Sequence, residues 1–95
     1  MISVRALREF WTTHADAEGA LRAWHDDAER ASWLSPHDLK ASYANASIIG
    51  NNRVVFNIRG NDYRLVVAVS YVAQIVLVKF VGTHAEYDQI DVEEV

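Results

Sequence analysis

The chain has 95 residues, of which 51% are hydrophobic and 23% charged, a composition typical of one folded domain and not of a disordered chain. Nine basic against thirteen acidic residues give a formal charge of −4, which argues against a protein that coats itself in nucleic acid. Cysteine is absent, which excludes disulfides and thiolate metal sites. No signal peptide or membrane-length apolar run is visible, so we expect a single domain over residues 1–95, cytoplasmic and not bound to a membrane.

A first helix is predicted close to the N-terminus. Its apolar residues recur at helical spacing: Val4, Leu7, Phe10 and Trp11. Ser3 is its candidate N-cap, and Met1–Ile2 is expected to form a short edge strand before it.

Two more helices are predicted before residue 45. Asp16 is the candidate cap of the second helix, whose apolar face carries Ala17, Ala20, Leu21, Trp24 and Ala28. Its opposite face is charged and carries Arg22, Asp26, Asp27, Glu29 and Arg30. The third helix is expected to start at Ser35, with Pro36 at the first helical position.

The second half of the chain predicts a sheet of three strands rich in Val, Ile, Phe and Tyr: Arg53–Arg59, Tyr63–Tyr71 and Gln74–Val81. Gly60–Asn61 predicts a two-residue hairpin turn. Val72–Ala73 is a poor turn sequence, so the second hairpin depends on strand lengths alone. The expected fold class is α+β, with N-terminal helices packed on a small, twisted, mainly antiparallel sheet.

Alternation along the strands predicts two different faces of this sheet. One face is apolar and is expected to form a core under the helices: Val54, Phe56, Ile58, Leu65, Val67, Val69, Val76, Val78 and Phe80. The other face carries polar side chains: Arg53, Asn57, Arg59, Arg64, Ser70 and Lys79. Acidic residues concentrate in the first helical region and in the C-terminal tail, which leaves a basic patch on an acidic molecule. Such a patch suits a phosphodiester, although a solvated sheet face also explains it.

The stretch FVGTHAEYDQID, residues 80–91, places polar groups where the last strand ends. Thr83 and Glu86 have the spacing of a capping box, which accounts for both without a catalytic role. His84 and Tyr87 are three apart and share a helical face, and Asp88 is placed to orient the His84 ring. Imidazole exchanges protons near neutral pH, so His84 and Tyr87 are candidate catalytic groups. The alternative is that both rings pack a short helix onto the sheet.

Two other groups receive structural interpretations. His25 and Glu29 lie four apart near two aspartates, but no metal motif matches and a solvated helix face explains them, so no metal site is predicted. The tryptophans are expected to pack between the helices and the sheet and not to stack on bases: Trp11, Trp24 and Trp33.

The stretches RVVFNIRGNDYRLVV and FVGTHAEYDQID resemble the HigB-type toxins of bacterial type II toxin–antitoxin modules, in the RelE-like mRNA interferase superfamily. The segments ALREFW, HADAEGALRAW and ASWLSP fit the same pattern, so the resemblance covers nearly the whole chain. Its most specific parts are two motifs. The hairpin motif consists of Asn57, Gly60, Asn61 and Arg64, and the motif at the end of the last strand consists of Thr83, His84, Glu86, Tyr87 and Asp88. The resemblance implies a RelE-like toxin fold with a short C-terminal helix and a site on the concave sheet face.

The same resemblance implies a toxin that cleaves mRNA, usually on the ribosome, and a cognate helix-turn-helix antitoxin of the HigA type that neutralises it in a hetero-oligomer. RNA supplies its own nucleophile, the 2′-hydroxyl, so neither a metal nor a cofactor is expected. Arg64 is expected to stabilise the phosphate, and His84 and Tyr87 to transfer protons in roles that the sequence does not assign. Other residues are expected to bind RNA: Arg53, Asn57, Arg59 and Lys79.

One property departs from the family. RelE-like toxins are generally basic, which favours ribosome binding through counterion release, whereas this chain is formally acidic. The alternative function is a non-catalytic binding module or co-repressor of the same fold that acts through a protein partner. Growth arrest with cleaved transcripts on induction favours the enzyme, and intact transcripts favour the binder.

Overall fold

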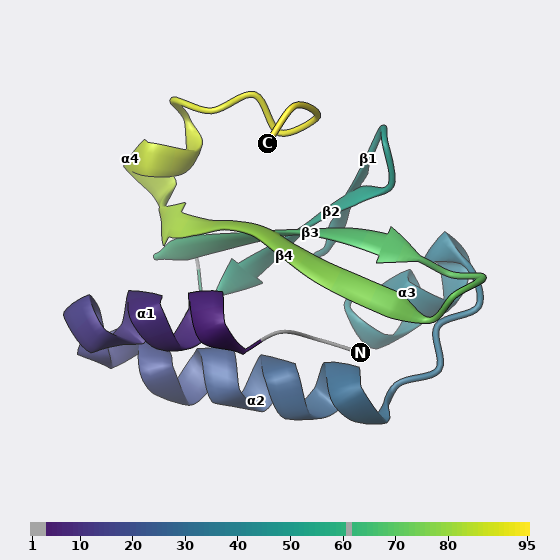
Figure 1. Cartoon of the computed structure of the whole chain (residues 1–95), viewed down its shortest axis with the longest axis horizontal. Coiled ribbons are helices and arrows are strands. Elements are labelled where there is room, and N and C mark those ends of the chain that lie inside the picture. The colour runs from purple at the N-terminus through teal and green to yellow at the C-terminus, as the bar shows by residue number, and fades with distance from the viewer. Residues whose placement is uncertain (1–3, 61) are drawn as a thin grey trace.

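The computed structural model describes residues 4–60 and 62–95 as helices on an antiparallel sheet. The helices are α1 (Arg5–Thr13), the short 3-10 helix η1 (Ala15–Ala17), α2 (Glu18–Arg30), α3 (Pro36–Ser42) and α4 (His84–Tyr87). The strands are β1 (Ser47–Ile49), β2 (Arg53–Ile58), β3 (Tyr63–Ser70) and β4 (Ile75–Thr83). Figure 1 shows α1 and α2 on one side of the sheet and α4 with the C-terminal segment on the other. The predicted α+β class, with N-terminal helices and a short C-terminal helix, is confirmed.

The strands lie in the order β1-β2-β3-β4, and every neighbouring pair is antiparallel. Side chains from β2 and β3 alternate into a core that α1, α2 and α3 cover, with Phe56, Leu65 and Leu39 at 2% exposure or less. Burying a Leu or Phe side chain contributes about 1.5–3 kcal/mol, so these contacts hold the helices on the sheet. The prediction for the tryptophans is confirmed, because all three are at most 8% exposed: Trp11, Trp24 and Trp33.

Of the predicted helix starts, one is confirmed and one is wrong. The Ser35 hydroxyl accepts a hydrogen bond from the Asp38 N–H at 3.2 Å, and Pro36 opens α3 as predicted. Asp16 does not cap α2, which begins at Glu18. Its carboxylate instead accepts a hydrogen bond from the Tyr63 hydroxyl, so a contact with the sheet replaces the cap. The predictions for Met1–Ile2 and for Ser3 fall outside the described residues.

Strand β1 was not predicted from the sequence. It pairs Ile49 with Arg53 and Ser47 with Val55, so it adds an edge to β2. The connection is a tight loop in which Asn51 and Asn52 have φ of 59° and 60°. Asparagine tolerates this left-handed region better than most residues, so the Gly-Asn-Asn sequence after two isoleucines was the available signal.

Both predicted two-residue turns are four-residue loops, over residues 59–62 and 71–74. At the first of them the Asp62 N–H donates to the Arg59 carbonyl at 3.2 Å, a bond that closes a turn around the predicted Gly60–Asn61 pair, and Asn61 itself is outside the described residues. Arg59 and Gly60 have φ of 52° and 66°, which ends β2 at Ile58. Arg59 therefore belongs to the loop and leaves the alternation of the strand.

A β-bulge in β4 changes which side chains share a face. Val66 pairs with Phe80, but Val67 pairs with Val78, so Lys79 is an extra residue in the ladder. One extra residue inverts the alternation, and the prediction that Phe80 belongs to the core face is therefore wrong. We call the face opposite α1 and α2 the site face; its central residues are Arg53, Val55, Asn57, Arg64, Val66 and Phe80.

Candidate functional site

Helix α4 begins where β4 ends because Thr83 caps it. The Thr83 hydroxyl accepts from the Glu86 N–H at 3.1 Å, and the Glu86 carboxylate accepts from the Thr83 N–H at 2.8 Å. The predicted capping box is thus confirmed. The Thr83 N–H also holds the pKa of Glu86 below its ordinary value. Such caps contribute about 1 kcal/mol, and this one directs the single turn that bears His84 and Tyr87.

The two candidate catalytic side chains of α4 have defined neighbours. His84 Nδ1 lies 3.2 Å from Asp88 Oδ2, so the carboxylate orients the ring, and 53% of the His84 side chain is exposed. The Tyr87 ring centre lies 6.0 Å from the guanidinium carbon of Arg64, a cation–π distance. The structure therefore brings together Arg64 from β3 and Tyr87 from α4, with His84 at the start of the same turn.

Arg64 occupies the middle row of the sheet at the α4 end. It pairs with Asn57 on one side and with Gly82 on the other. Gly82 is buried, and a Cβ added there would lie 2.6 Å from Phe80 Cζ, so the aromatic ring lies directly over this glycine. The site face thus gathers Arg64, Asn57 and Tyr87, and it adds Phe80, which simple alternation assigns to the core face.

Arg53 lies on the same face but is not next to Arg64. It lies four positions along β2 from Asn57, a distance of about 13 Å. Its Nε and Nη2 donate to the Val95 backbone oxygen at 3.1 and 2.6 Å, and its Nη1 donates to the Asn51 carbonyl at 3.1 Å. Lys79 is exposed at the bulge. Of these two predicted RNA-binding cations, Arg53 is thus held by Val95 and Asn51, and Lys79 is exposed next to Phe80.

Arg59 is directed to a different part of the molecule. Its Nη1 donates to Asp16 at 3.1 Å and to Asp62 at 2.8 Å, and Asp16 also accepts the Tyr63 hydroxyl at 2.5 Å. The Tyr63 hydroxyl, and then the Arg59 charge, lower the pKa of Asp16, and the same bond raises the pKa of Tyr63. Because two carboxylates hold Arg59 beside η1, the structure does not bring it to Arg64.

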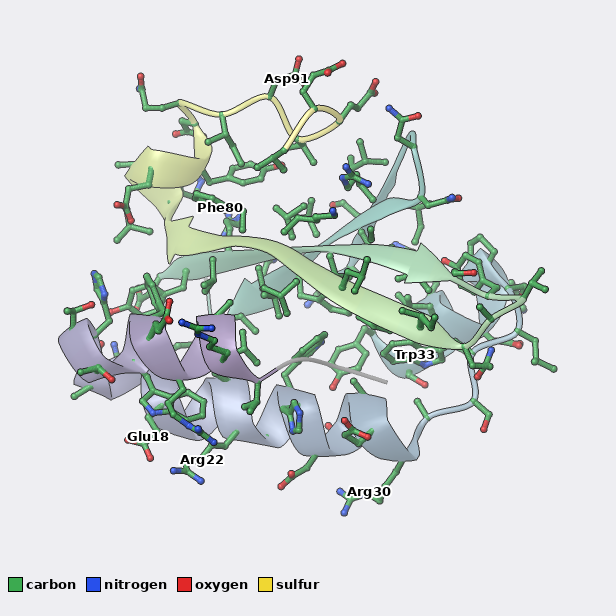
Figure 2. The ribbon with its side chains drawn as sticks, viewed as in Figure 1. Glu18, Arg22, Arg30, Trp33, Phe80 and Asp91 are labelled. Atoms are coloured by element: carbon green, nitrogen blue, oxygen red, sulfur yellow. The ribbon has the colours of Figure 1, made fainter. Side chains whose placement is uncertain are left out.

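The charged outer side of α2 is remote from the site face. Figure 2 shows Glu18, Arg22 and Arg30 on the far side of α2, and Phe80 and Asp91 on the side of the sheet that carries α4. The pairs on α2 are exposed helix pairs, such as Arg22 with Glu18 at 2.7 Å. Among residues 4–60 and 62–95, no three His, Cys, Asp or Glu side chains gather as a metal site.

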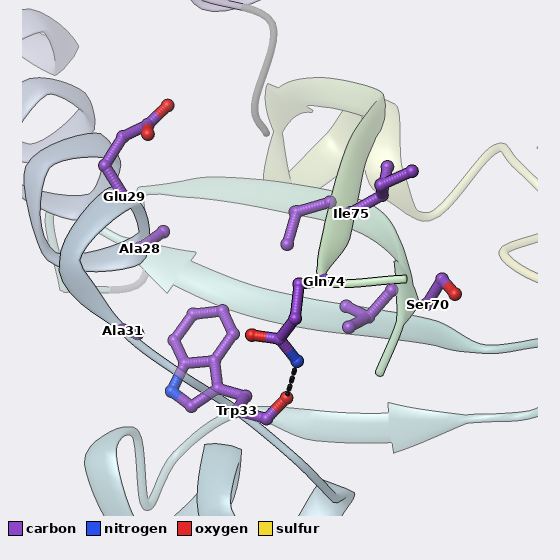
Figure 3. Close-up of a pocket in the computed structure, with 9 residues that line it drawn as sticks. Ala28, Glu29, Ala31, Trp33, Ser70, Gln74 and Ile75 are labelled. Carbon is purple, nitrogen blue, oxygen red and sulfur yellow. Dashed lines mark hydrogen bonds between the residues drawn. The ribbon is translucent and has the colours of Figure 1, made fainter. Parts of the chain in front are cut away.

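A small cavity lies between the end of α2 and the β3–β4 hairpin (Figure 3). Its volume is about 170 Å³, and core residues such as Ala28, Trp33 and Val76 line it. Gln74 Nε2 closes one side by donating to the Trp33 carbonyl at 2.7 Å. Ligand pockets usually measure roughly 300–1,000 Å³, so this cavity does not suit a nucleotide.

Two features of the site face do not follow from the sequence pattern. Phe80 was missed because residues 76–81 are apolar except Lys79, so the bulge leaves no signal. The bonds from Arg53 to Val95 join positions 42 apart, which no local pattern reveals. The acidic C-terminal tail was the available hint.

Residues 17–90 match the protein family HigB_toxin, described as the RelE-like toxic component of a toxin-antitoxin system. This chain belongs to the HigB_toxin family. The match runs from the start of α2 beyond α4, so the resemblance seen in the sequence is confirmed. This HigB-family protein is a RelE-like toxin component, and the family implies a cognate antitoxin as its partner. A search of curated proteins found no match. Within its described residues, no helix of the toxin has the length and apolar character needed to cross a membrane.

Proposed function

We propose that this toxin is an mRNA endoribonuclease that cleaves through the RNA 2′-hydroxyl and so inhibits translation. The observation that carries the proposal is the meeting of Arg64, from the middle of the sheet, with Tyr87 on the capped turn that also bears His84. Membership of a toxin family whose members are generally ribonucleases supports the same function.

In the proposed reaction the 2′-oxygen bonds to phosphorus while the bond from phosphorus to the 5′-oxygen breaks. A general base takes the 2′-hydroxyl proton, and a general acid gives a proton to the leaving 5′-oxygen. His84, with its ring oriented by Asp88, and Tyr87 perform these two transfers. The Arg64 guanidinium donates charge-assisted hydrogen bonds to the phosphate oxygens as negative charge grows there. The products are a 2′,3′-cyclic phosphate and a 5′-hydroxyl, and no metal or cofactor takes part.

RNA binding is assigned to Arg53 and Asn57 on the site face and to Lys79, the exposed extra residue of the β4 bulge. Asn57 lies opposite Arg64 and is exposed, so its amide is placed to contact a base or the sugar next to the phosphate. Arg59 is left out of this assignment because Asp16 and Asp62 already neutralise it. We expect the ribosome to present the mRNA, as the resemblance to RelE-like toxins implies, although the net charge of −4 weakens long-range attraction to any RNA, ribosomal RNA included.

The test uses purified toxin and a labelled mRNA with and without translating ribosomes. We expect cleavage with ribosomes present, products that end in a 2′,3′-cyclic phosphate, and a complete block when the cleaved nucleotide carries 2′-deoxyribose. Tyr87→Phe is expected to slow cleavage by about 10²–10⁴-fold, whereas Tyr71→Phe, in the loop after β3, is the control and is expected to leave the rate unchanged. Cleavage that continues at the 2′-deoxy position contradicts the mechanism. Intact RNA under all conditions supports the non-catalytic alternative.

A further inference from the structure

The middle of the site face is covered. Val55 and Val66 pair across β2 and β3 and are 3% and 0% exposed, although they point away from the core under α1 and α2. Figure 1 shows the chain after α4 turning back across this side of the sheet. We call residues 89–95 the C-terminal strap. RNA that bridges Arg53 and Arg64 would have to pass over the same two valines.

The strap is attached at its far end by hydrogen bonds to β2 and to the loop before it. Arg53 donates twice to the Val95 backbone oxygen, and Asn51 Nδ2 donates to the Glu93 carbonyl at 3.3 Å. The strap also holds its own shape, because the backbone N–H groups of Glu94 and Val95 both donate to the Asp91 carbonyl at 3.0 Å. Its position over the site face is therefore defined by several contacts at once.

The chemistry of the strap is like that of the proposed substrate. It is an anionic segment with carboxylates at Asp91, Glu93 and Glu94, and it places an oxygen on the guanidinium of Arg53. A single-stranded RNA offers the same features to this face, namely negative charges along a chain and oxygens for arginine. The two chains cannot occupy Arg53 and the surface above Val55 together.

We infer that the C-terminal strap occupies the RNA-binding surface of the site face and leaves it when RNA binds. The inference rests on the proposed ribonuclease function and names the path of its substrate, from Arg64 over Val55 and Val66 to Arg53. Because the strap competes with RNA, the apparent affinity for RNA equals the affinity of the open form multiplied by the fraction of molecules that are open.

A disulfide tests this directly, because the chain contains no cysteine. A Cβ added at Gly50 would lie 3.3 Å from the Glu93 carboxylate and 3.5 Å from its Cδ, so the side chains at positions 50 and 93 are neighbours, and titration of free thiols first establishes that cysteines there form the disulfide. The variant Gly50→Cys/Glu93→Cys is compared oxidised and reduced. The probe is a fluorescent 2′-O-methyl RNA oligonucleotide, which binds but cannot be cleaved, and cleavage of unmodified mRNA on ribosomes is measured in parallel.

Oxidation is expected to weaken RNA binding by about tenfold or more, with reduction restoring it, while each single variant binds alike in both states. As a second variant, Asp91→Asn/Glu93→Gln/Glu94→Gln is expected to bind the oligonucleotide several-fold more tightly than the unmodified toxin. Equal binding by the oxidised and reduced forms, while the reduced form still cleaves mRNA, overturns the strap inference alone. Redox-dependent binding without any cleavage overturns the proposed catalysis and leaves the strap inference intact. No binding in either state contradicts both.

Discussion

Gly82→Ala tests how tightly the site face is assembled around Arg64. A Cβ at this position would lie 2.6 Å from Phe80 Cζ and 3.0 Å from Glu86 Oε1. The ring tip must therefore retreat by about 1 Å to reach an ordinary carbon–carbon contact. Overpacking of this kind costs about 1–3 kcal/mol of folding free energy. In a domain of this size each kcal/mol lowers Tm by about 4–8 °C.

The assay is thermal and urea unfolding of a double-mutant cycle with Phe80→Ala. If the clash with the ring causes the loss, Gly82→Ala should cost less than about 0.5 kcal/mol once the ring has been removed. Gly19→Ala is the matched control: it lies in α2 with nothing within 4 Å of the added methyl group. There the same change is expected to stabilise the toxin by about 0.5–1 kcal/mol. An equal loss from Gly82→Ala with and without the Phe80 ring would refute this account of the site face.

Three further predictions concern the cap, the arginines and pH. Thr83→Ala and Ser35→Ala should each lower the free energy of unfolding in urea by about 0.5–2 kcal/mol. Only Thr83→Ala should also reduce mRNA cleavage by more than tenfold, because it misdirects α4, and equal effects of the two variants on cleavage would contradict this role. Arg64→Ala should reduce the salt dependence of RNA affinity by about 0.7 in slope, whereas Arg59→Ala should leave it unchanged because two carboxylates already neutralise Arg59. The folded-state pKa values of Asp16 and Glu86 are lowered, so their stabilisation is present above the ordinary carboxyl range and is lost as pH falls below about 4. The drop in Tm between pH 7 and pH 3 should shrink in Asp16→Asn but not in Glu9→Gln, an exposed control on α1.

Local sequence patterns predicted those features of this toxin that depend on residues close together along the chain. The Thr83 and Ser35 caps depend on atoms within three residues along the chain, and both form as predicted. The core face of β2 and β3 follows from strict alternation, which also placed Arg64 opposite the core. These features follow from backbone geometry, so the sequence alone suffices for them.

Features that depend on contacts between residues far apart in the sequence could not be predicted in this way. Asp16 is an ordinary capping residue by sequence, but the hydroxyl of Tyr63, 47 positions away, and Arg59 bind its carboxylate in the fold. The bulge at Lys79 lies in a largely apolar run, so the apolar pattern reads the same on either side of it. The contact of Arg53 with Val95 joins two distant segments, and it changes an apparently open cation into one that the strap covers.

Transcript-end mapping after induction of the toxin in growing cells tests the central claim most directly. The toxin is compared with Arg64→Ala and His84→Ala, and with Arg30→Ala and His37→Ala as exposed controls on α2 and α3. We predict growth arrest and new mRNA ends with the unmodified toxin and both controls, and a loss of at least about a hundredfold in cleavage with each site variant. New mRNA ends at full frequency in a folded His84→Ala or Arg64→Ala variant would contradict the account.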